Sequence, residues 1–305
     1  MKKIAVKNTD LEVSAIGLGA MRIGDKTEQE VNALILDALE LGINLYDHAD
    51  IYGGGKCEEI FGKALKKTAG LRKKIILQSK CGIRQNSFDF SKEHILSSVD
   101  GILSRLQTDY LDILLLHRPD ALMEPEEVAE AFAALKSSGK VRYFGVSNHN
   151  PMQIALLQKY TDEKLVIDQL QFSPTNTTMI QAGLNVNMEN SSAINRDGSV
   201  LDYCRLNDIT VQAWSPLQYG MFAGPYLGNE KYKELNRTLD GLAEKYEVSN
   251  AAIAIAWILR HPARIQPILG STRISHIREI SRAADITLDR EEWYRIYCSA
   301  GNELP

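Results

Sequence analysis

The stretch LDILLLHRP, residues 111–119, shows the pattern that decides the fold. Its apolar run Leu111–Leu116 has the length of a buried strand, and a polar residue, His117, follows directly. Further short apolar runs recur on both sides of it, at residues 16–19, 43–46, 75–77, 141–146, 165–170, 209–214 and 267–269. The sequence therefore predicts eight buried strands.

Helical segments separate these strands. Patterns with the helical period cover residues 27–41, 58–67, 92–106, 125–137 and 150–160. Helix-starting side chains stand at Thr27, Ser91 and Asn150, and helix-ending glycines stand at Gly42, Gly70 and Gly139. Strands buried on both faces that alternate with helices form a parallel sheet, either an open doubly wound sheet or a closed barrel.

Two observations favour the barrel. Eight strand–helix repeats match the (β/α)8 TIM barrel. The segment from Gly17 to Arg22 lacks the third glycine that an open dinucleotide-binding sheet carries after its first strand. We expect a single α/β domain over residues 1–305, with residues 1–15 as a β-hairpin that caps the barrel bottom. Residues 183–199, rich in Asn and Ser, are expected to form a long surface loop, either a lid or a decoration.

Composition excludes several classes of protein. The 305 residues are 44% hydrophobic and 24% charged, as in a folded globular protein. The net charge of -4, with no basic stripe, argues against a nucleic-acid partner. No window has the apolar character of a membrane span or export signal. Four separated cysteines without a Cys-x-x-Cys pair indicate reduced thiols, no zinc site and a cytoplasmic protein.

Polar residues stand where the predicted strands end. They are Asp47, Lys80, His117, Ser147, Asn148, Gln169 and the group Gly270, Ser271 and Thr272. In a (β/α)8 barrel the carboxyl ends of all strands meet on one face, where active sites lie. Each residue alone fits a structural role, such as half of an ion pair or a packed histidine. Together they indicate a site.

Together with the phenol of Tyr52, the side chains of Asp47, Lys80 and His117 could carry out one chemical task. A tyrosine has an ordinary pKa of about 10, and a neighbouring Lys80 ammonium is expected to lower it. Asp47 is expected to hold that ammonium in place, and His117 to hydrogen-bond a substrate carbonyl. The set predicts a proton donor beside a polarised carbonyl.

Several segments resemble, in order and spacing, the motifs of the aldo-keto reductase superfamily. Residues 47–53, DHADIYG, followed by Glu58, resemble the signature D-x-A-x-x-Y-G…E. Later matches are residues 78–80 (QSK), 114–119 (LLLHRP), 145–148 (GVSN), Gln169 with residues 173–174 (SP), residues 214–217 (WSPL) and residues 270–272 (GST). Residues 49–62 and 193–204 resemble a bacterial branch of NADP-dependent oxidoreductases.

This resemblance implies that an aldehyde or ketone is reduced by hydride transfer from a nicotinamide cofactor, NADPH rather than NADH. Tyr52 is then the general acid, Lys80 and Asp47 tune it, and His117 orients the carbonyl of the small-molecule substrate. The implied cofactor-binding residues are Gly19, Ala20, Met21, Asp47, Ser147, Asn148, Gln169, Trp214, Ser215, Pro216, Leu217, Gly270, Ser271, Thr272, Arg273 and Glu279. Of these, Ser147, Asn148 and Gln169 are expected at the nicotinamide carboxamide, with Trp214 stacked on the ring.

The phosphate end departs from the family pattern. His276 and Ile280 stand where relatives commonly have the Arg and Asn of the adenosine 2′-phosphate site, so Arg273 or Arg278 is the expected source of positive charge. The free N-terminus of a helix from about Ile274 is suited to a phosphate. Two alternatives stay open: a non-catalytic, regulatory nicotinamide-binding protein on the same barrel, and a lyase or hydrolase that forms a Schiff base on Lys80.

Overall fold

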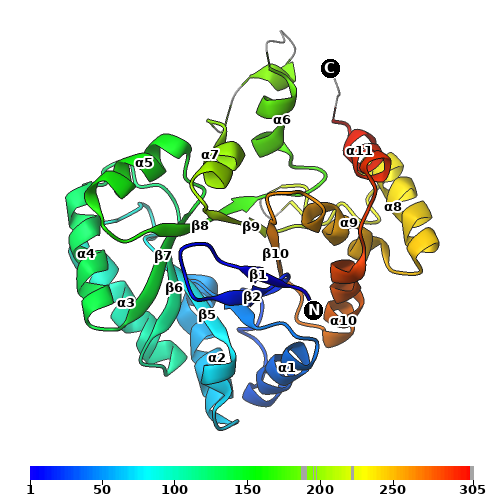
Figure 1. Ribbon diagram of the computed structural model, residues 1–305. Helices are drawn as coiled ribbons and strands as arrows, with labels where there is room; N and C mark the ends of the chain where they lie inside the picture. The colour runs from blue at the N-terminus through cyan, green and yellow to red at the C-terminus, as the bar shows by residue number, and fades with distance from the viewer. Residues whose placement is uncertain (187–190, 195, 197, 221–222, 303–305) are drawn as a thin grey trace.

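The computed structural model describes residues 1–186, 191–194, 196, 198–220 and 223–302. Within these residues, eight parallel strands close into a barrel in the order β10-β3-β4-β5-β6-β7-β8-β9 (Figure 1). They are β3 (Gly17–Gly19), β4 (Leu45–Asp47), β5 (Ile76–Cys81), β6 (Leu111–Leu116), β7 (Val141–Ser147), β8 (Leu165–Gln171), β9 (Thr210–Trp214) and β10 (Gln266–Leu269). Each of the eight predicted runs overlaps one barrel strand, and the predicted (β/α)8 barrel is confirmed.

Helices surround the barrel (Figure 1). They are α1 (Glu28–Glu40), α2 (Lys56–Lys66), α3 (Lys92–Leu106), α4 (Pro125–Ser137), α5 (Pro151–Tyr160), α6 (Thr178–Leu184), α7 (Val200–Leu206), α8 (Lys233–Tyr246), α9 (Asn250–Leu259), α10 (Ile274–Ser281) and α11 (Arg290–Ser299). The side chains of Thr27, Ser91 and Asn150 cap the N-termini of α1, α3 and α5, as predicted. None of these helices has the length and apolar character needed to cross a membrane.

The predicted loop at residues 183–199 is only partly a loop. Helix α6 continues to Leu184, and a 3-10 turn spans Ser191–Ala193. Residues 187–190, 195 and 197 of this segment lie outside the described residues. The sequence pattern did not indicate α6 or α7, because each is seven residues long and neither has a side-chain N-cap.

An N-terminal hairpin closes one end of the barrel, as predicted. Its strands β1 (Lys3–Ala5) and β2 (Glu12–Ser14) pair antiparallel, and Figure 1 shows them lying across the barrel opening. The buried side chains of Val6, Leu11 and Val13 pack against apolar residues at the lower ends of the barrel strands. Gln266 of β10 donates from Nε2 to the Ser14 carbonyl oxygen. The hairpin is therefore packed and hydrogen-bonded to the barrel bottom.

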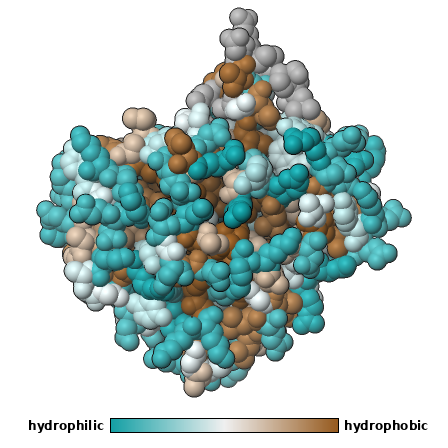
Figure 2. All heavy atoms as spheres, in the orientation of Figure 1, coloured by the Kyte–Doolittle hydropathy of each residue, from teal (hydrophilic) through white to brown (hydrophobic). Residues whose placement is uncertain are grey.

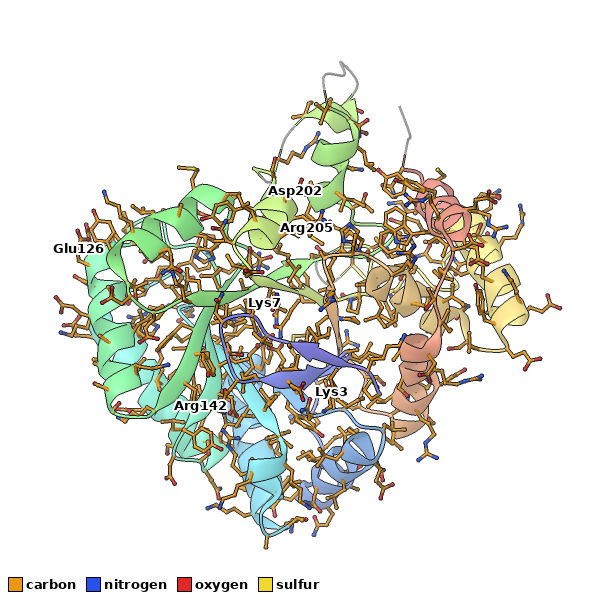
Figure 3. The ribbon with its side chains drawn as sticks, viewed as in Figure 1. Lys3, Lys7, Glu126, Arg142, Asp202 and Arg205 are labelled. Carbon is orange, nitrogen blue, oxygen red and sulfur yellow. The ribbon has the colours of Figure 1, made fainter. Side chains whose placement is uncertain are left out.

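An arginine ties the tip of the hairpin to the sheet. Arg142 of β7 (Figure 3) donates from Nη2 to both carboxylate oxygens of Asp10 at 2.8 Å. Its Nη1 donates to Asp112 of β6 at 2.7 Å. Arg72 contacts the other oxygen of Asp112 at 2.9 Å. Figure 2 shows this end of the molecule as mainly hydrophilic, with separate apolar patches.

Candidate active site

The predicted catalytic side chains meet at the carboxyl ends of neighbouring strands. Asp47 ends β4, Lys80 lies in β5, His117 follows β6, and Tyr52 begins a short 3-10 helix after β4. The Lys80 Nζ atom lies 2.7 Å from each carboxylate oxygen of Asp47 and 3.3 Å from the Tyr52 hydroxyl oxygen. The rings of Tyr52 and His117 meet edge to face, with centroids 6.0 Å apart. The structure therefore brings all four into one cluster.

The ion pair between Lys80 and Asp47 is buried. The side chain of Lys80 is 0% exposed and that of Asp47 is 4% exposed. Burial by itself lowers the pKa of Lys80, but Asp47 and Tyr52 outweigh it, so the pKa lies above its ordinary value. A lysine that is held protonated is a poor amine nucleophile, which argues against the Schiff-base alternative.

The pKa of Tyr52 shifts opposite to the sequence prediction. Burial raises it above the ordinary value of 10.0, and the nearby Lys80 charge opposes that rise without cancelling it. The hydroxyl is therefore protonated at neutral pH. The Lys80 ammonium, 3.3 Å from the hydroxyl oxygen, is nevertheless placed to stabilise a phenolate at this position.

The two histidines near the cluster have different surroundings. Burial, together with the charges of Lys80 and Arg118, lowers the pKa of His117 well below its ordinary value, so the imidazole is neutral and keeps one N–H donor. Its Nδ1 atom has no hydrogen-bond partner among the described residues. His48 is fully buried against the ring of Phe61, with centroids 4.4 Å apart, and burial lowers its pKa to about 3. His48 therefore packs behind the site.

Three consecutive glycines shape the loop that carries Tyr52. Gly53, Gly54 and Gly55 have φ angles of 60°, 64° and 94°. This left-handed region is open to glycine and strained for other residues. A Cβ atom on Gly55 would also lie 2.9 Å from Cδ of Arg105. The glycines let the chain turn sharply from Tyr52 into α2.

Glu58 of α2 anchors this loop from behind. Its buried carboxylate accepts a hydrogen bond from the Ser79 hydroxyl at 2.7 Å and another from Arg105 Nε at 2.8 Å. Burial raises the pKa of Glu58, although both partners oppose the rise. Because Ser79 adjoins Lys80, the contact joins α2 to the strand that carries the lysine.

Buried amides support Asp47 from inside the barrel. Gln78 and Gln169 direct their Nε2 atoms at Asp47 Oδ1, at 2.6 and 3.2 Å. Both also donate to Oε1 of Gln212, at 2.8 and 3.0 Å, and Gln212 donates to Gln266 at 2.9 Å. All four glutamines are buried. The orientation of the Asp47 carboxylate is therefore set from the barrel interior as well as by Lys80.

The residues predicted at the nicotinamide lie in one hydrogen-bonded chain. Ser147 donates from Oγ to the Gln169 carbonyl oxygen at 2.8 Å, and Asn148 donates from Nδ2 to Ser147 Oγ at 2.8 Å. The Trp214 indole N–H donates to Asn148 Oδ1 at 3.1 Å. The chain fixes the orientation of the partly exposed Trp214 ring.

Residues 19–21, predicted to bind the cofactor, pass beside Asp47. Gly19 of β3 pairs with Asp47 across the sheet, and the Ala20 N–H donates to the Asp47 carbonyl oxygen at 2.8 Å. The Met21 carbonyl oxygen accepts a hydrogen bond from the Cys57 thiol at 3.3 Å.

The residues predicted at the phosphates lie in two separate turns. The first follows β9, where Ser215 has a φ of 47°. Tyr226 holds this turn through two hydrogen bonds. Its hydroxyl donates to the Pro216 carbonyl oxygen at 3.0 Å, and its backbone N–H donates to the Leu217 carbonyl oxygen at 3.3 Å. The backbone there is therefore fixed in shape.

The second turn joins β10 to α10. Gly270, Ser271 and Thr272 lie in it, and Arg273 precedes α10 without a side-chain cap. Arg273 donates from its N–H to Ser271 Oγ at 3.2 Å, and its Nη2 lies 3.0 Å from His276 Nδ1. A guanidinium thus lies at an uncapped helix N-terminus, an arrangement that suits a phosphate.

Residues further along α10 are less suited to binding a phosphate. Arg278 and Glu279 are exposed, whereas Ile280 is 5% exposed and packs into the hydrophobic core. Ile280 therefore faces the protein interior, and the structure gives it no access to a ligand.

Comparison with known proteins bears on this geometry. The sequence model described as the aldo/keto reductase family matches residues 15–297. The chain belongs to the aldo-keto reductase family. It is 39% identical to an uncharacterized oxidoreductase, YcsN, of Bacillus subtilis over 97% of both chains. It is 37% identical to a 6-dehydroglucose reductase of Agrobacterium fabrum over 100% of both.

A solved structure agrees with the family and with the fold. A thermostable aldo-keto reductase in complex with the inhibitor epalrestat is 29% identical and aligns with a TM-score of 0.78, covering 98% of this chain and 100% of that one. The sequence resemblance is thereby confirmed, and the chain is an oxidoreductase enzyme of the aldo-keto reductase type, a family that acts on small-molecule carbonyl compounds with a nicotinamide cofactor.

A groove among the described residues of this aldo-keto reductase lies apart from the predicted site residues. It has a volume of about 430 Å³ and is lined by parts of α6, α7 and α11 and by residues 260–262, which follow α9. Asp202 and Arg205 of α7 (Figure 3) belong to its lining. None of the predicted site residues does. The groove is therefore separate from the cluster around Tyr52.

Sequence reasoning missed some supports of the aldo-keto reductase site. Gln78, Gln212 and Gln266 were not selected as site residues, although each lies within or directly beside a predicted apolar run, a signal for an inward polar contact. Arg105 carries no local signal, since its role depends on α3 packing beside α2.

Proposed function

We propose that this aldo-keto reductase reduces an aldehyde or ketone to an alcohol with NADPH, and that Tyr52 donates the proton. The observation that carries the proposal is the buried Lys80 ammonium, in contact with both the Asp47 carboxylate and the Tyr52 hydroxyl. A nicotinamide, when bound, supplies a hydride to the carbonyl carbon. The protein then needs a proton donor for the carbonyl oxygen and a way to stabilise the charge that proton transfer creates.

The cluster supplies both. Tyr52 is protonated in the free site because burial raises its pKa. As negative charge develops on the carbonyl oxygen, the hydroxyl gives up its proton and the phenolate forms next to Lys80. Asp47 keeps Lys80 charged and oriented. The neutral His117 donates its N–H to the same carbonyl oxygen and fixes the substrate's orientation.

The residues present fit a nicotinamide dinucleotide. The uncapped N-terminus of α10, with Arg273 and His276 at it, supplies positive charge and N–H groups for a phosphate. A Cβ atom built on Gly270 meets no other atom within 4 Å, so the surface before α10 is open to a ligand. The Trp214 ring, oriented by Asn148, offers a flat face for the nicotinamide. The guanidinium of Arg273 supports NADPH over NADH.

Replacing Tyr52 by phenylalanine tests the proposal. The change removes only the hydroxyl, so the rate of NADPH oxidation with an aldehyde is expected to fall about 100- to 10,000-fold, the usual contribution of a general acid. NADPH affinity, measured by quenching of protein fluorescence, is expected to stay within about twofold, since Tyr52 is assigned to the proton and not to the cofactor.

Tyr160→Phe is the matched control, because Tyr160 is exposed at the end of α5, outside the cluster. Full turnover by Tyr52→Phe contradicts the assigned role. Tight NADPH binding by the native protein without turnover of any carbonyl compound supports the non-catalytic alternative. The relative named 6-dehydroglucose reductase supports including an aldehyde that carries hydroxyl groups among the test substrates.

We also propose that residues 1–305 form one domain around this site.

A further inference from the structure

The groove lined by α6, α7 and α11 takes no part in the proposed reaction. It has a volume of about 430 Å³, within the usual range for small-molecule sites. Its apolar side chains are Met179, Ile180, Leu184, Leu201 and Trp293. All of these except Leu184 are buried, so they form a packed floor. The partly exposed Tyr294 adds an aromatic wall, because its ring meets that of Trp293 edge to face, with centroids 5.0 Å apart.

The polar part of the groove is mainly positive. Arg205 on α7 (Figure 3), Arg260 after α9 and Arg290 at the start of α11 belong to its lining. The one carboxylate among the described lining residues is that of Asp202. The protein as a whole carries a net charge of -4, so this excess of positive charge is local. The groove therefore favours an anion.

The three arginines keep donors for a ligand. Arg205 contacts Asp202 through one nitrogen, at 3.5 Å. Arg260 donates from Nε to the Leu288 carbonyl oxygen at 2.7 Å, which holds the guanidinium and leaves its two Nη groups for other acceptors. Arg290 is exposed, and its side chain forms no ion pair or hydrogen bond with the described part of the chain. An anion in the groove can therefore reach guanidinium donors from three different elements.

His261 also lines the groove and lies within the field of these charges. Burial lowers the pKa of His261 to about 4; the charges of Arg205 and Arg260 add to the decrease, and that of Asp202 opposes it. The imidazole is therefore neutral at neutral pH. Its Nδ1 atom accepts from the Ala263 N–H at 3.1 Å, so Nε2 carries the hydrogen and is a further donor.

We propose that this groove binds a small organic anion with an apolar, ring-shaped body, such as an aromatic carboxylate or sulfonate. The charged group lies against the arginine side chains, which form charge-assisted hydrogen bonds with anionic oxygen atoms. The ring lies on the apolar floor beside Tyr294 and Trp293. An inorganic anion leaves that floor in contact with water, and a neutral ring leaves the arginines without an acceptor, so the site selects a ligand that has both features.

The test uses the dye anilinonaphthalene sulfonate, an aromatic anion whose fluorescence rises in apolar surroundings. Three competitors displace it: naphthalene sulfonate has the ring and the charge, naphthol has the ring without a charge at neutral pH, and inorganic sulfate has the charge alone. Naphthalene sulfonate is expected to bind at least about 10-fold more tightly than either of the others. If naphthol or inorganic sulfate competes equally well, the proposal is overturned.

Variants test whether the probe lies in the groove. The double change Arg205→Met and Arg290→Met removes two lining charges and keeps unbranched side chains. It is expected to weaken both sulfonates at least about 10-fold and to leave naphthol within about twofold. Asp202→Asn removes the opposing carboxylate and is expected to tighten the sulfonates about 2- to 5-fold. Unchanged sulfonate affinity in the double variant, or weaker binding in Asp202→Asn, overturns the proposal.

The matched controls come from α8. Arg237 and Glu234 form an exposed ion pair with i,i+3 spacing, as Arg205 and Asp202 do, but neither lines the groove. Arg237→Met and Glu234→Gln are expected to bind all four compounds as the native protein does. If Arg237→Met loses as much sulfonate affinity as the groove variant, the effect is one of overall charge, and the site is overturned.

A second readout does not use the dye. Naphthalene sulfonate at about 100 times its dissociation constant is expected to raise the melting temperature of the native protein by about 4 °C. At the same concentration, the rise expected for the double variant is about 2 °C or less, because its affinity is lower. Equal rises in the two proteins contradict binding in the groove. Neither readout depends on turnover, so the result stands whether or not the protein reduces a carbonyl compound.

Discussion

Replacing Asp47 by asparagine tests the electrostatics of the site. The change preserves side-chain shape but removes the negative charge that lies 2.7 Å from Lys80 through both oxygens. Lys80 keeps the His48 carbonyl oxygen at 2.8 Å and the Tyr52 hydroxyl as partners, yet its ammonium loses the contacting counter-charge in a fully buried position. Removing one partner of a buried ion pair costs about 3–5 kcal/mol of folding free energy.

The cost converts to a change in melting temperature. With an unfolding entropy of about 2.1 cal/mol/K per residue over 305 residues, the melting temperature is expected to fall by about 5–8 °C, as measured by differential scanning calorimetry at neutral pH.

The pH dependence of folding stability provides a second measurement. In the native protein the pKa of Lys80 is raised, so its stabilising contribution is complete below the ordinary lysine pKa of 10.5 and is lost only above it.

In Asp47→Asn the pH dependence of folding stability is expected to have the opposite sign. Burial, which lowers the pKa of Lys80, is then opposed only by weaker partners. The folded variant binds fewer protons than the unfolded chain, so its stability rises as pH increases toward 10.5. Adding Lys80→Met to Asp47→Asn removes the buried charge and is expected to recover most of the loss. A single variant that melts within about 1 °C of the native protein, or that shows no rise with pH, refutes this account of the pair.

Three further changes test other parts of the structure. Gln212→Leu leaves two buried amide donors and one acceptor without their partner, so the urea midpoint is expected to fall by an amount equivalent to about 2–4 kcal/mol; a midpoint equal to the native one contradicts the support role of the amides. Burial and the charge of Glu58 raise the pKa of Asp50 to about 7, so the folded protein binds more protons than the unfolded chain and native stability falls as pH rises from about 4 to 7. Asp50→Asn is expected to remove this fall and to be more stable by about 2–4 kcal/mol at neutral pH; parallel pH–stability curves for the two proteins speak against it. Arg273→Met is expected to weaken NADPH at least about 10-fold more than NADH in fluorescence titrations, and equal losses remove the 2′-phosphate role from this residue.

Periodicity was enough to predict the barrel, because strands buried on both faces leave mainly apolar runs such as Leu111–Leu116, in which Asp112 is the one polar residue. The polar ends of those runs were also visible, and the structure brings Asp47, Lys80 and His117 together as the strand ends predicted. The sign of the Tyr52 pKa was not accessible from sequence, because it depends on how far burial outweighs one nearby charge. The groove that Arg205 and Arg290 line was equally hidden, since it joins residues that lie far apart in the chain.

The buried amides have a consequence for the direction of hydrogen bonding inside the barrel. Both ends of the column accept, the Asp47 carboxylate at one end and the Ser14 carbonyl at the other, so the donor direction must reverse somewhere between them. It reverses at Gln78 and Gln169, whose NH2 groups each serve Asp47 on one side and Gln212 on the other.

Serving two acceptors with one NH2 group leaves Oε1 of Gln78 buried without a partner among the described residues. A flip of any one amide would place two acceptors or two donors face to face. The interior therefore has a single hydrogen-bond isomer, selected by the acceptors at its two ends, the Asp47 carboxylate and the Ser14 carbonyl. The carboxylate that contacts Lys80 at one end of the barrel thus also sets how the amides are oriented down to the hairpin at the other end.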